Sequence, residues 1–418
     1  MKIKEKSIIV LMFILVVTLC SFPSRDAFPA EKEKPPIVFG GLFMLSGRAA
    51  VVGLPNYQAA LLAVEEINAR GGLLGRKLEL LARDTKAQPA QAVKEATMYI
   101  MRDKVDFLYG TASSSEGLAV AEVALKYKKI LFSPEVTTDK FTVENFNRYI
   151  FRTDHMNTME MRSGAIYMAK FPYKRWYTIG PDYEYGHDAV RAFVEEFKKM
   201  RPDVTIAGES WPKLNEPDYT PHIQKMLEMK PDAIFSALWG GDSIAFIKQG
   251  VGFGLFEKIP YFCVGGVGDS TGHQALGKDM PVGLHGGVKY WFGYDYTPKN
   301  KEFVQAYRNR FGDYPSLYTM CSYVGMQFMA KAIEKAGTVD TEKVVDALAG
   351  LTIDTPIGPQ TLRKEDHTVI APHIWGKTCK DPKYDFLVMC NMQVVPGEKN
   401  APSIEEVMNW RKAAAAKK

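Results

Sequence analysis

Residues 37–45, IVFGGLFML, decide the fold class of this chain together with the two segments that follow them. The segment 57–69 places Ala60 and Val64 on one apolar face, which predicts an amphipathic helix. KLELLARD, at 77–84, is strand-like again. Two strand-like runs separated by a helix predict a βαβ unit in a parallel sheet.

The same alternation continues along most of the chain. Further strand-like runs, separated by helical patterns, lie at 105–110, 129–134, 175–180, 204–210 and 232–239. Because 418 residues exceed the roughly 250–300 at which one hydrophobic core stops growing, we expect two lobes. The predicted fold class is α/β, with two doubly wound Rossmann-like lobes.

The last third of the chain differs in kind. Helical patterns cover 300–311 and 318–336, a strand is expected at 288–292, and an antiparallel pair at 371–377 and 386–394. The turn-rich stretches 265–268 and 281–287 suit a chain that passes from one lobe to the other.

The composition excludes two classes of protein. Apolar residues at 46% and charged residues at 24% are ordinary globular values, which excludes wholesale disorder. The 53 basic and 48 acidic residues give a net charge of +5, and the basic residues are scattered. Without a basic stripe interleaved with stacking aromatics, we expect no nucleic-acid partner.

The N-terminal segment has the pattern of an export signal. Ser7–Cys20 is a mostly apolar run of about 14 residues behind three lysines, shorter than the ~20 needed to span a bilayer. We expect residues 1–30 to be a signal peptide and the mature protein to be periplasmic. A buried helix or anchor is the alternative. Lipid attachment at Cys20 is a further one, although Leu19 stands where such signals favour a small residue.

Four cysteines follow the expected signal: Cys263, Cys321, Cys379 and Cys390. An even number in an oxidising compartment permits up to two disulfides, and sequence does not determine their connectivity. Cys379 and Cys390 are near enough along the chain to bridge a hairpin. Cys263 and Cys321 resemble small buried apolar residues.

Motifs for nucleotides, metals and redox chemistry are missing from the sequence. It contains no Walker-type phosphate loop and no CxxC, and its seven histidines have no HExxH spacing. The glycines at 71–75 lack the GxGxxG order and follow a helix, so turn glycines are the preferred interpretation. We therefore expect no enzyme activity, no cofactor and no metal.

Hydroxyl-rich and aromatic turns follow several expected strands, at the sheet edge where α/β proteins bind ligands. TASSSE (111–116) opens a helix; Ser113 and Glu116 match a capping box, which leaves capping alone or capping plus anion binding open. EVTT (135–138) is an ordinary turn or a second hydroxyl site. In the other half, 181–186 and 239–242 offer aromatic rings and acids.

Several longer segments carry a resemblance. They are GLFMLSGRAAVVG (41–53), AVEEINARGGLLGRKLEL (63–80), YGTASSSEG (109–117), ILFSPEVTTDKFT (130–142), DYEYG (182–186), the stretch 303–337 and RKEDH (363–367). In this order and spacing, the chain resembles the type I periplasmic solute-binding proteins of ABC transporters, in the leucine/isoleucine/valine-binding family. The match covers nearly the whole mature chain.

The resemblance implies two lobes joined by three crossovers that close over a solute without catalysing a reaction. The implied lobes are 36–155 plus 284–368 and 156–283 plus 369–418. By position, Ser114 would hold an amino acid's carboxylate, and Thr137 both carboxylate and ammonium. Glu135 would act through its backbone carbonyl. Tyr185, with Tyr183 as a neighbour, would line the second-lobe side.

The sequence also departs from the family pattern. Gly265 stands where the family has its ammonium-binding glutamate, and Asp242 where a site tyrosine is usual. Either Asp242 binds the ammonium or the ligand has none. Arg48, in the first strand-to-helix turn, binds a carboxylate or is simply solvated. The ring of Trp239 either stacks on the ligand or simply ends a core strand.

The expected function is that of a receptor that captures an amino acid or related small carboxylate and delivers it to a membrane permease, as a monomer. The alternative is a ligand sensor of the same fold that is not coupled to transport. The export signal argues against a cytoplasmic regulator.

Overall fold

The computed structural model describes residues 34–416, so the expected signal peptide, 1–30, lies outside the described residues. Residues from Pro35 onward pack as one unit that contains two large sheets. Among the described residues, no helix is both long and apolar enough to cross a membrane.

The first sheet is parallel throughout, with strand order β2-β1-β3-β4-β5. Its strands are β1 (Ile37–Phe43), β2 (Leu78–Asp84), β3 (Phe107–Gly110), β4 (Leu131–Ser133) and β5 (Ile150–Arg152). The helices between them are α1 (Ala50–Ala69), α2 (Pro89–Met101), α3 (Ser114–Tyr127) and α4 (Asp139–Thr142). The βαβ rhythm predicted from 37–84 is confirmed.

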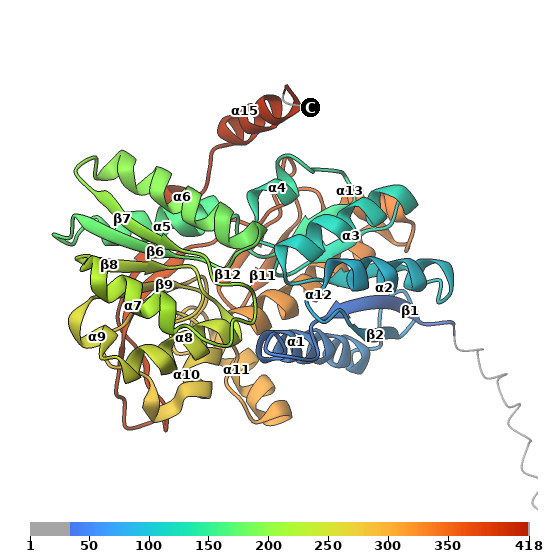
Figure 1. Cartoon of the computed structure of the whole chain (residues 1–418). Coiled ribbons are helices and arrows are strands. Elements are labelled where there is room, and N and C mark those ends of the chain that lie inside the picture. The colour runs from blue at the N-terminus through green and yellow to red at the C-terminus, as the bar shows by residue number, and fades with distance from the viewer. Residues whose placement is uncertain (1–33, 417–418) are drawn as a thin grey trace, which may run out of the picture. The chain divides into compact units, whose positions relative to one another are not determined.

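Later segments complete this first lobe. They are α11 (Pro298–Phe311), α12 (Leu317–Ala336), α13 (Thr341–Leu348) and the hairpin of β11 (Thr352–Thr355) and β12 (Gly358–Thr361). Helix α12 packs against α1, and its buried side chains join those of the sheet in one apolar core. In Figure 1 the orange α11–α13 region accordingly lies among the blue and cyan elements.

The second sheet has the order β14-β13-β10-β9-β8-β6-β7. Its parallel strands are β6 (Arg175–Ile179), β7 (Thr205–Ser210), β8 (Ala233–Ser236), β9 (Tyr261–Val264) and β10 (His285–Val288); β13 (His373–Cys379) and β14 (Val388–Val395) are antiparallel. The predicted antiparallel pair near the C-terminus is therefore confirmed.

Helices cover the second sheet. They are α5 (Asn157–Met168), α6 (Glu184–Met200), α7 (Thr220–Met229), α8 (Gly240–Gly252), α9 (Leu255–Lys258), α10 (Ser270–Leu276) and the 3-10 turn η1 (Gly277–Asp279), with α14 (Gly397–Asn400) near the C-terminus. The last helix, α15 (Ile404–Ala415), instead buries Val407 in a separate small cluster with Met156 and Met159. Trp375 of β13 anchors α5: its ring lies against Tyr167, and its Nε1 donates to Ser163 Oγ at 3.0 Å.

The chain passes between the sheets after β5, after β10 and after β12, as three crossovers require. Two expectations about these passages are wrong. Residues 265–268 connect β9 to α10 within the second lobe. The strand expected at 288–292 ends at Val288, because the chain turns back there and the Tyr294 amide donates to Trp291 O at 3.0 Å.

The position of β10 also changes one lobe boundary. The boundary at 284 would assign Gly286 and Gly287 to the first lobe, yet both are paired with β9 and β13 of the second sheet. A side chain at Gly287 would meet the Trp375 ring at 2.3 Å, so glycine is needed for this close packing rather than for a flexible connection. We therefore propose that the second crossover begins after Val288.

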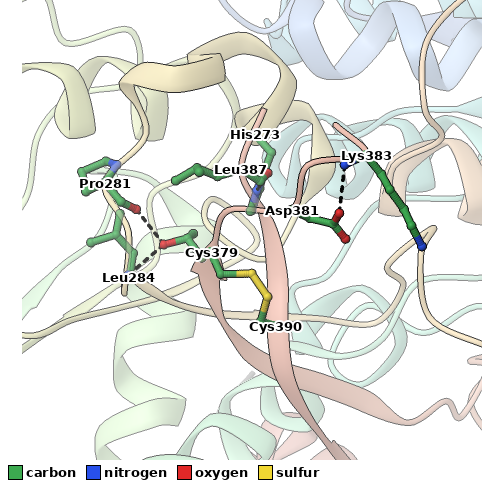
Figure 2. The surroundings of a disulfide bond; sticks show 9 residues. His273, Pro281, Leu284, Cys379, Asp381, Lys383, Leu387 and Cys390 are labelled. Carbon is green, nitrogen blue, oxygen red and sulfur yellow. Dashed lines mark hydrogen bonds between the residues drawn. A yellow bond between two sulfur atoms is a disulfide. The ribbon is translucent and has the colours of Figure 1, made fainter. Parts of the chain in front are cut away.

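The hairpin of β13 and β14 carries a disulfide between Cys379 and Cys390, whose Cα atoms are 6.0 Å apart (Figure 2). Next to it, the Thr378 hydroxyl donates to Pro281 O at 2.6 Å and accepts from the Leu284 amide at 3.0 Å. These hydrogen bonds hold the hairpin against the loop at 281–284, which precedes β10. Cys263 and Cys321 are buried and free.

Candidate functional site

A small cavity of about 50 Å³ lies between the two lobes, where strand ends of both sheets face each other. The structure brings six of the eight predicted site residues to its wall: Ser114, Glu135, Thr137, Tyr183, Tyr185 and Trp239. It also lines the cavity with Asp154, His155, Glu160 and Tyr318, which sequence reasoning missed.

Ser114 and Thr137 form what we call the hydroxyl end of the cavity. Ser114 is the first residue of α3, directly after the cap Ser113, whose hydroxyl accepts from the Glu116 amide at 3.2 Å. The predicted capping box is therefore present. The Thr138 amide donates to Ser114 Oγ at 3.3 Å, which holds the turn after β4 against the start of α3. Both turns thus converge on one helix N-terminus, where unpaired N–H groups and the helix dipole favour an anion.

Glu135 lies beside the hydroxyl end and is buried. Neither of its carboxyl oxygens makes a hydrogen bond of acceptable geometry with a described residue. Burial, and then the neighbouring Asp154, raise the pKa of Glu135 well above its ordinary value. This favours the neutral acid, which can donate a hydrogen bond as well as accept one. A role for its backbone carbonyl, which the family resemblance implies, stays a prediction.

Aromatic rings form the wall contributed mostly by the second lobe. Tyr183 precedes α6 and Tyr185 lies in its first turn, with ring centroids 6.1 Å apart, and Trp239 Nε1 donates to the Tyr183 hydroxyl at 3.1 Å. Tyr318 of α12 adds a ring from the first lobe. Burial raises the pKa of Tyr185 and Tyr318, so their phenols stay protonated. Such a wall can pack against the apolar body of a solute.

A second group, which we call the histidine end, consists of His155 and Glu160, which line the cavity, and His373 beside them. His155 follows β5, with Nδ1 2.7 Å from Asp154 Oδ1 and Nε2 3.2 Å from Glu160 Oε2. Burial alone lowers the pKa of His155, but the carboxylates of Asp154 and Glu160 outweigh it and raise the value to about 9. The His373 ring of β13 lies edge-on to His155, with centroids 4.5 Å apart.

Part of the histidine end could have been predicted from the sequence. Asp154 and His155 follow the strand IFR (150–152), just as Ser114 follows β3 and Thr137 follows β4. The same rule about strand ends would have selected them. For His373 there was no such signal, because it begins a strand more than two hundred residues later.

Arg48 and Asp242 do not line the cavity. Arg48 Nη1 donates to Glu216 O at 2.5 Å and lies 3.4 Å from Asp242 Oδ1, and Asp242 Oδ2 accepts from the Asn215 amide at 2.9 Å. Arg48 follows β1 and Asp242 lies in α8, so the pair joins the two lobes. The structure thus gives both residues a partner other than a ligand. Gly265 does line the cavity, and a Cβ there would meet nothing within 4 Å.

A family model described as "Periplasmic binding protein" matches residues 36–376. The chain belongs to the periplasmic binding protein family. Proteins of this family bind small solutes, and the resemblance to its leucine/isoleucine/valine-binding members is confirmed. The predicted fold class is confirmed as well.

Known members are similar to this periplasmic binding protein over most of its length. The leucine-, isoleucine-, valine-, threonine- and alanine-binding protein of Pseudomonas aeruginosa is 26% identical over 317 residues, which cover 75% of this chain and 82% of that protein. The structure of an amino acid ABC transporter substrate-binding protein from Pseudomonas fluorescens is 27% identical, with a TM-score of 0.77 over 90% of this chain and 98% of the other.

The fold is also shared with a solute-binding protein of an ABC transporter from Rhodopseudomonas palustris in complex with 3,4-dihydroxybenzoic acid. That structure is 24% identical, with a TM-score of 0.79, and covers 87% of this chain and 98% of the other.

Proposed function

We propose that this protein is the periplasmic receptor of an ABC importer and that it captures a small carboxylate between its lobes. The observation that carries the proposal is the convergence of Ser114 and Thr137 on the N-terminus of α3, in a cavity walled by aromatic rings. Hydroxyl and N–H donors at a helix start are suited to a carboxylate. The names of the relatives from both Pseudomonas species point the same way.

The ligand's carboxylate would lie at the hydroxyl end and its body against Tyr183, Tyr185 and Trp239. We assign no ammonium contact to Asp242, because Arg48 and the Asn215 amide already occupy its oxygens. An α-amino group, in a ligand that has one, would instead meet the unpartnered carboxyl oxygens of Glu135. The ligand class is therefore an amino acid or an amine-free acid with an apolar body.

The protein would act as a monomer and pass its ligand to a membrane permease without chemical change. The Arg48–Asp242 pair supports closure of the lobes, because its partners lie on opposite sides of the cavity. Closure excludes water, and charge-assisted hydrogen bonds to a carboxylate are stronger in a desolvated site than in water.

A thermal-unfolding screen tests the proposal. Protein refolded to remove carried-over solute is heated with amino acids, aromatic acids, dicarboxylates and amides, including the five amino acids of the Pseudomonas aeruginosa protein's name and 3,4-dihydroxybenzoate. A true ligand at 100 times its Kd should add about 2.7 kcal/mol to the free energy of unfolding. Stabilisation by amides but by no carboxylate would contradict the proposal.

A further inference from the structure

His155, Glu160 and His373 offer three metal-ligand atoms that all lie within 4.8 Å of one another. They come from the first crossover, from α5 and from β13, so the fold rather than a sequence motif assembles them. All three side chains are buried. Two imidazoles and one carboxylate are the donor set of many sites for zinc and other divalent transition metals.

The surroundings of the two histidines are those of metal ligands. A ligating histidine usually donates its other ring N–H to a carboxylate, a backbone carbonyl or a water. Nδ1 of His155 faces Asp154 at 2.7 Å, which leaves Nε2 on the side of Glu160. Nδ1 of His373 lies 2.9 Å from the side-chain amide nitrogen of Asn400, and turning that amide by 180° would place its oxygen, which as it stands has no partner within the described chain, where it accepts from Nδ1–H. His373 Nε2 has no hydrogen-bond partner among the described residues, and neither ring nitrogen of His155 makes a hydrogen bond of acceptable geometry.

The charge of the region also favours a cation. The carboxyl groups of Asp154 and Glu160 both line the cavity, and burying carboxylates without compensation is costly. The buried ammonium of Lys289 donates to Thr153 O instead of to one of these carboxyl groups. A divalent cation would offset this carboxylate charge.

We propose that the histidine end binds one divalent first-row transition-metal ion through His155 Nε2, Glu160 and His373 Nε2. Small side-chain rotations bring donors at this spacing to the ~2.0–2.2 Å of such bonds. His155 and Glu160 line the cavity, so the open coordination position faces the solute. A carboxylate or hydroxyl oxygen of the solute completes the coordination there. The metal site is independent of the proposed function, whereas this last contact rests on it.

Titration of chelator-treated protein with Co²⁺ and Zn²⁺, without solute, tests the metal site. We expect one ion per chain, visible d–d bands for Co²⁺ and displacement of Co²⁺ by Zn²⁺. Glu160→Gln and His373→Gln should each weaken Zn²⁺ binding at least about 100-fold, and Asp154→Asn about 10- to 100-fold. Circular dichroism and the melting temperature of each metal-free variant establish that it is folded. Glu160→Gln replaces the carboxylate by an amide of the same shape, so this variant alone tests the site if His373→Gln does not fold.

His187→Gln is the control, since His187 is an exposed histidine paired with Asp182. It should bind Zn²⁺ like the unmodified chain. Absence of stoichiometric binding, or full binding by Glu160→Gln, would overturn the metal site and leave His155 as an imidazolium paired with two carboxylates.

The solute contact is tested separately, by adding a ligand from the thermal screen to the Co²⁺ form. A change in the d–d bands supports coordination. Unchanged bands, with ligand affinity equal in the presence and absence of metal, would overturn the contact. A failure of the proposed function is a different result: no carboxylate would bind to either form.

Discussion

In the hydroxyl end, Ser114 and Thr137 lie on consecutive strand-to-helix turns of a single sheet, whereas in the histidine end His155, Glu160 and His373 come from a crossover, a helix and an edge hairpin. The hydroxyl end uses small side chains and a helix N-terminus. The histidine end uses ionisable groups that are buried together. The contrast indicates that one side of the site is set by local turns, and the other by how the two lobes are joined.

The largest expected effect is a loss of ligand affinity when the hydroxyl end is altered and the histidine end is left intact. Ser114→Ala combined with Thr137→Ala should weaken binding of the carboxylate ligand by about 3 kcal/mol or more, because each hydrogen bond to a charged group is worth roughly 1.5–3 kcal/mol. Calorimetric titration measures this, with Ser115→Ala, one residue further along α3, as the control. Zn²⁺ binding at the histidine end should be unaffected. Unchanged ligand affinity would remove both hydroxyls from the site.

The next effect concerns the hairpin that carries His373. Replacing both Cys379 and Cys390 by serine should lower the free energy of unfolding by about 3 kcal/mol, because the disulfide closes a loop with a sequence separation of 11. Urea unfolding of the double variant and of the native protein measures it. Ligand binding at the hydroxyl end should survive. A loss of ligand affinity larger than the loss of Zn²⁺ affinity would contradict the separation of the two ends.

Another buried histidine, His367, packs against β5. His367 stacks on Phe151 of β5 with ring centroids 4.0 Å apart, and its Nδ1 lies 2.8 Å from Ile150 O. Burial lowers the pKa of His367 to about 4; the Ile150 carbonyl and Asp366 oppose this shift, while Arg411 and Arg148 add to it. Unlike His155, His367 is therefore a neutral imidazole in the protein interior.

This difference predicts an acid sensitivity. Between pH 6.5 and 4 the unfolded chain binds a proton at His367 that the folded protein excludes, so stability falls as the pH falls. The cost should reach about 2–3 kcal/mol by pH 4.5. His367→Asn tolerates the left-handed backbone at φ 52° and should flatten the pH dependence of urea unfolding by that amount. An equally steep profile in the variant would assign the sensitivity to other groups.

The smallest effect is expected at the pair between the lobes. Arg48 is partly exposed, and such pairs contribute only about 0.2–1 kcal/mol, so Arg48→Gln should change ligand affinity less than about fivefold. Calorimetric titration measures it, with Arg102→Gln, which breaks a surface pair with Asp103, as the control. A loss above about tenfold, confined to acidic ligands, would restore Arg48 as a carboxylate ligand.

The sequence predicted what local patterns determine. The strand and helix rhythm from Ile37 onward, the capping box before Ser114 and the C-terminal hairpin each depend on residues close together in the chain. Hydrophobic periodicity and the residues typical of caps and turns predict such features directly. The hydroxyl end belongs to this class, since each of its residues lies between a strand and the body of the next helix.

What sequence could not supply depends on long-range packing. Arg48 and Asp242 have charges suited to a ligand, but only the folded chain shows that they pair with each other and with the 215–216 loop. Gly286 and Gly287 looked like a turn because the Trp375 ring that requires them lies far along the chain. His373 meets His155 only once β13 has joined the second sheet.

The order in which the chain supplies its elements has a consequence for folding. Helix α12, which packs on α1, is synthesised long after it, and the hairpin that completes the second sheet comes near the C-terminus. Neither lobe can therefore finish folding while the ribosome is still making the first three hundred residues. Contacts so distant in sequence also slow the search for the native state. The fold thus leaves a long interval during synthesis in which neither lobe has all of its elements.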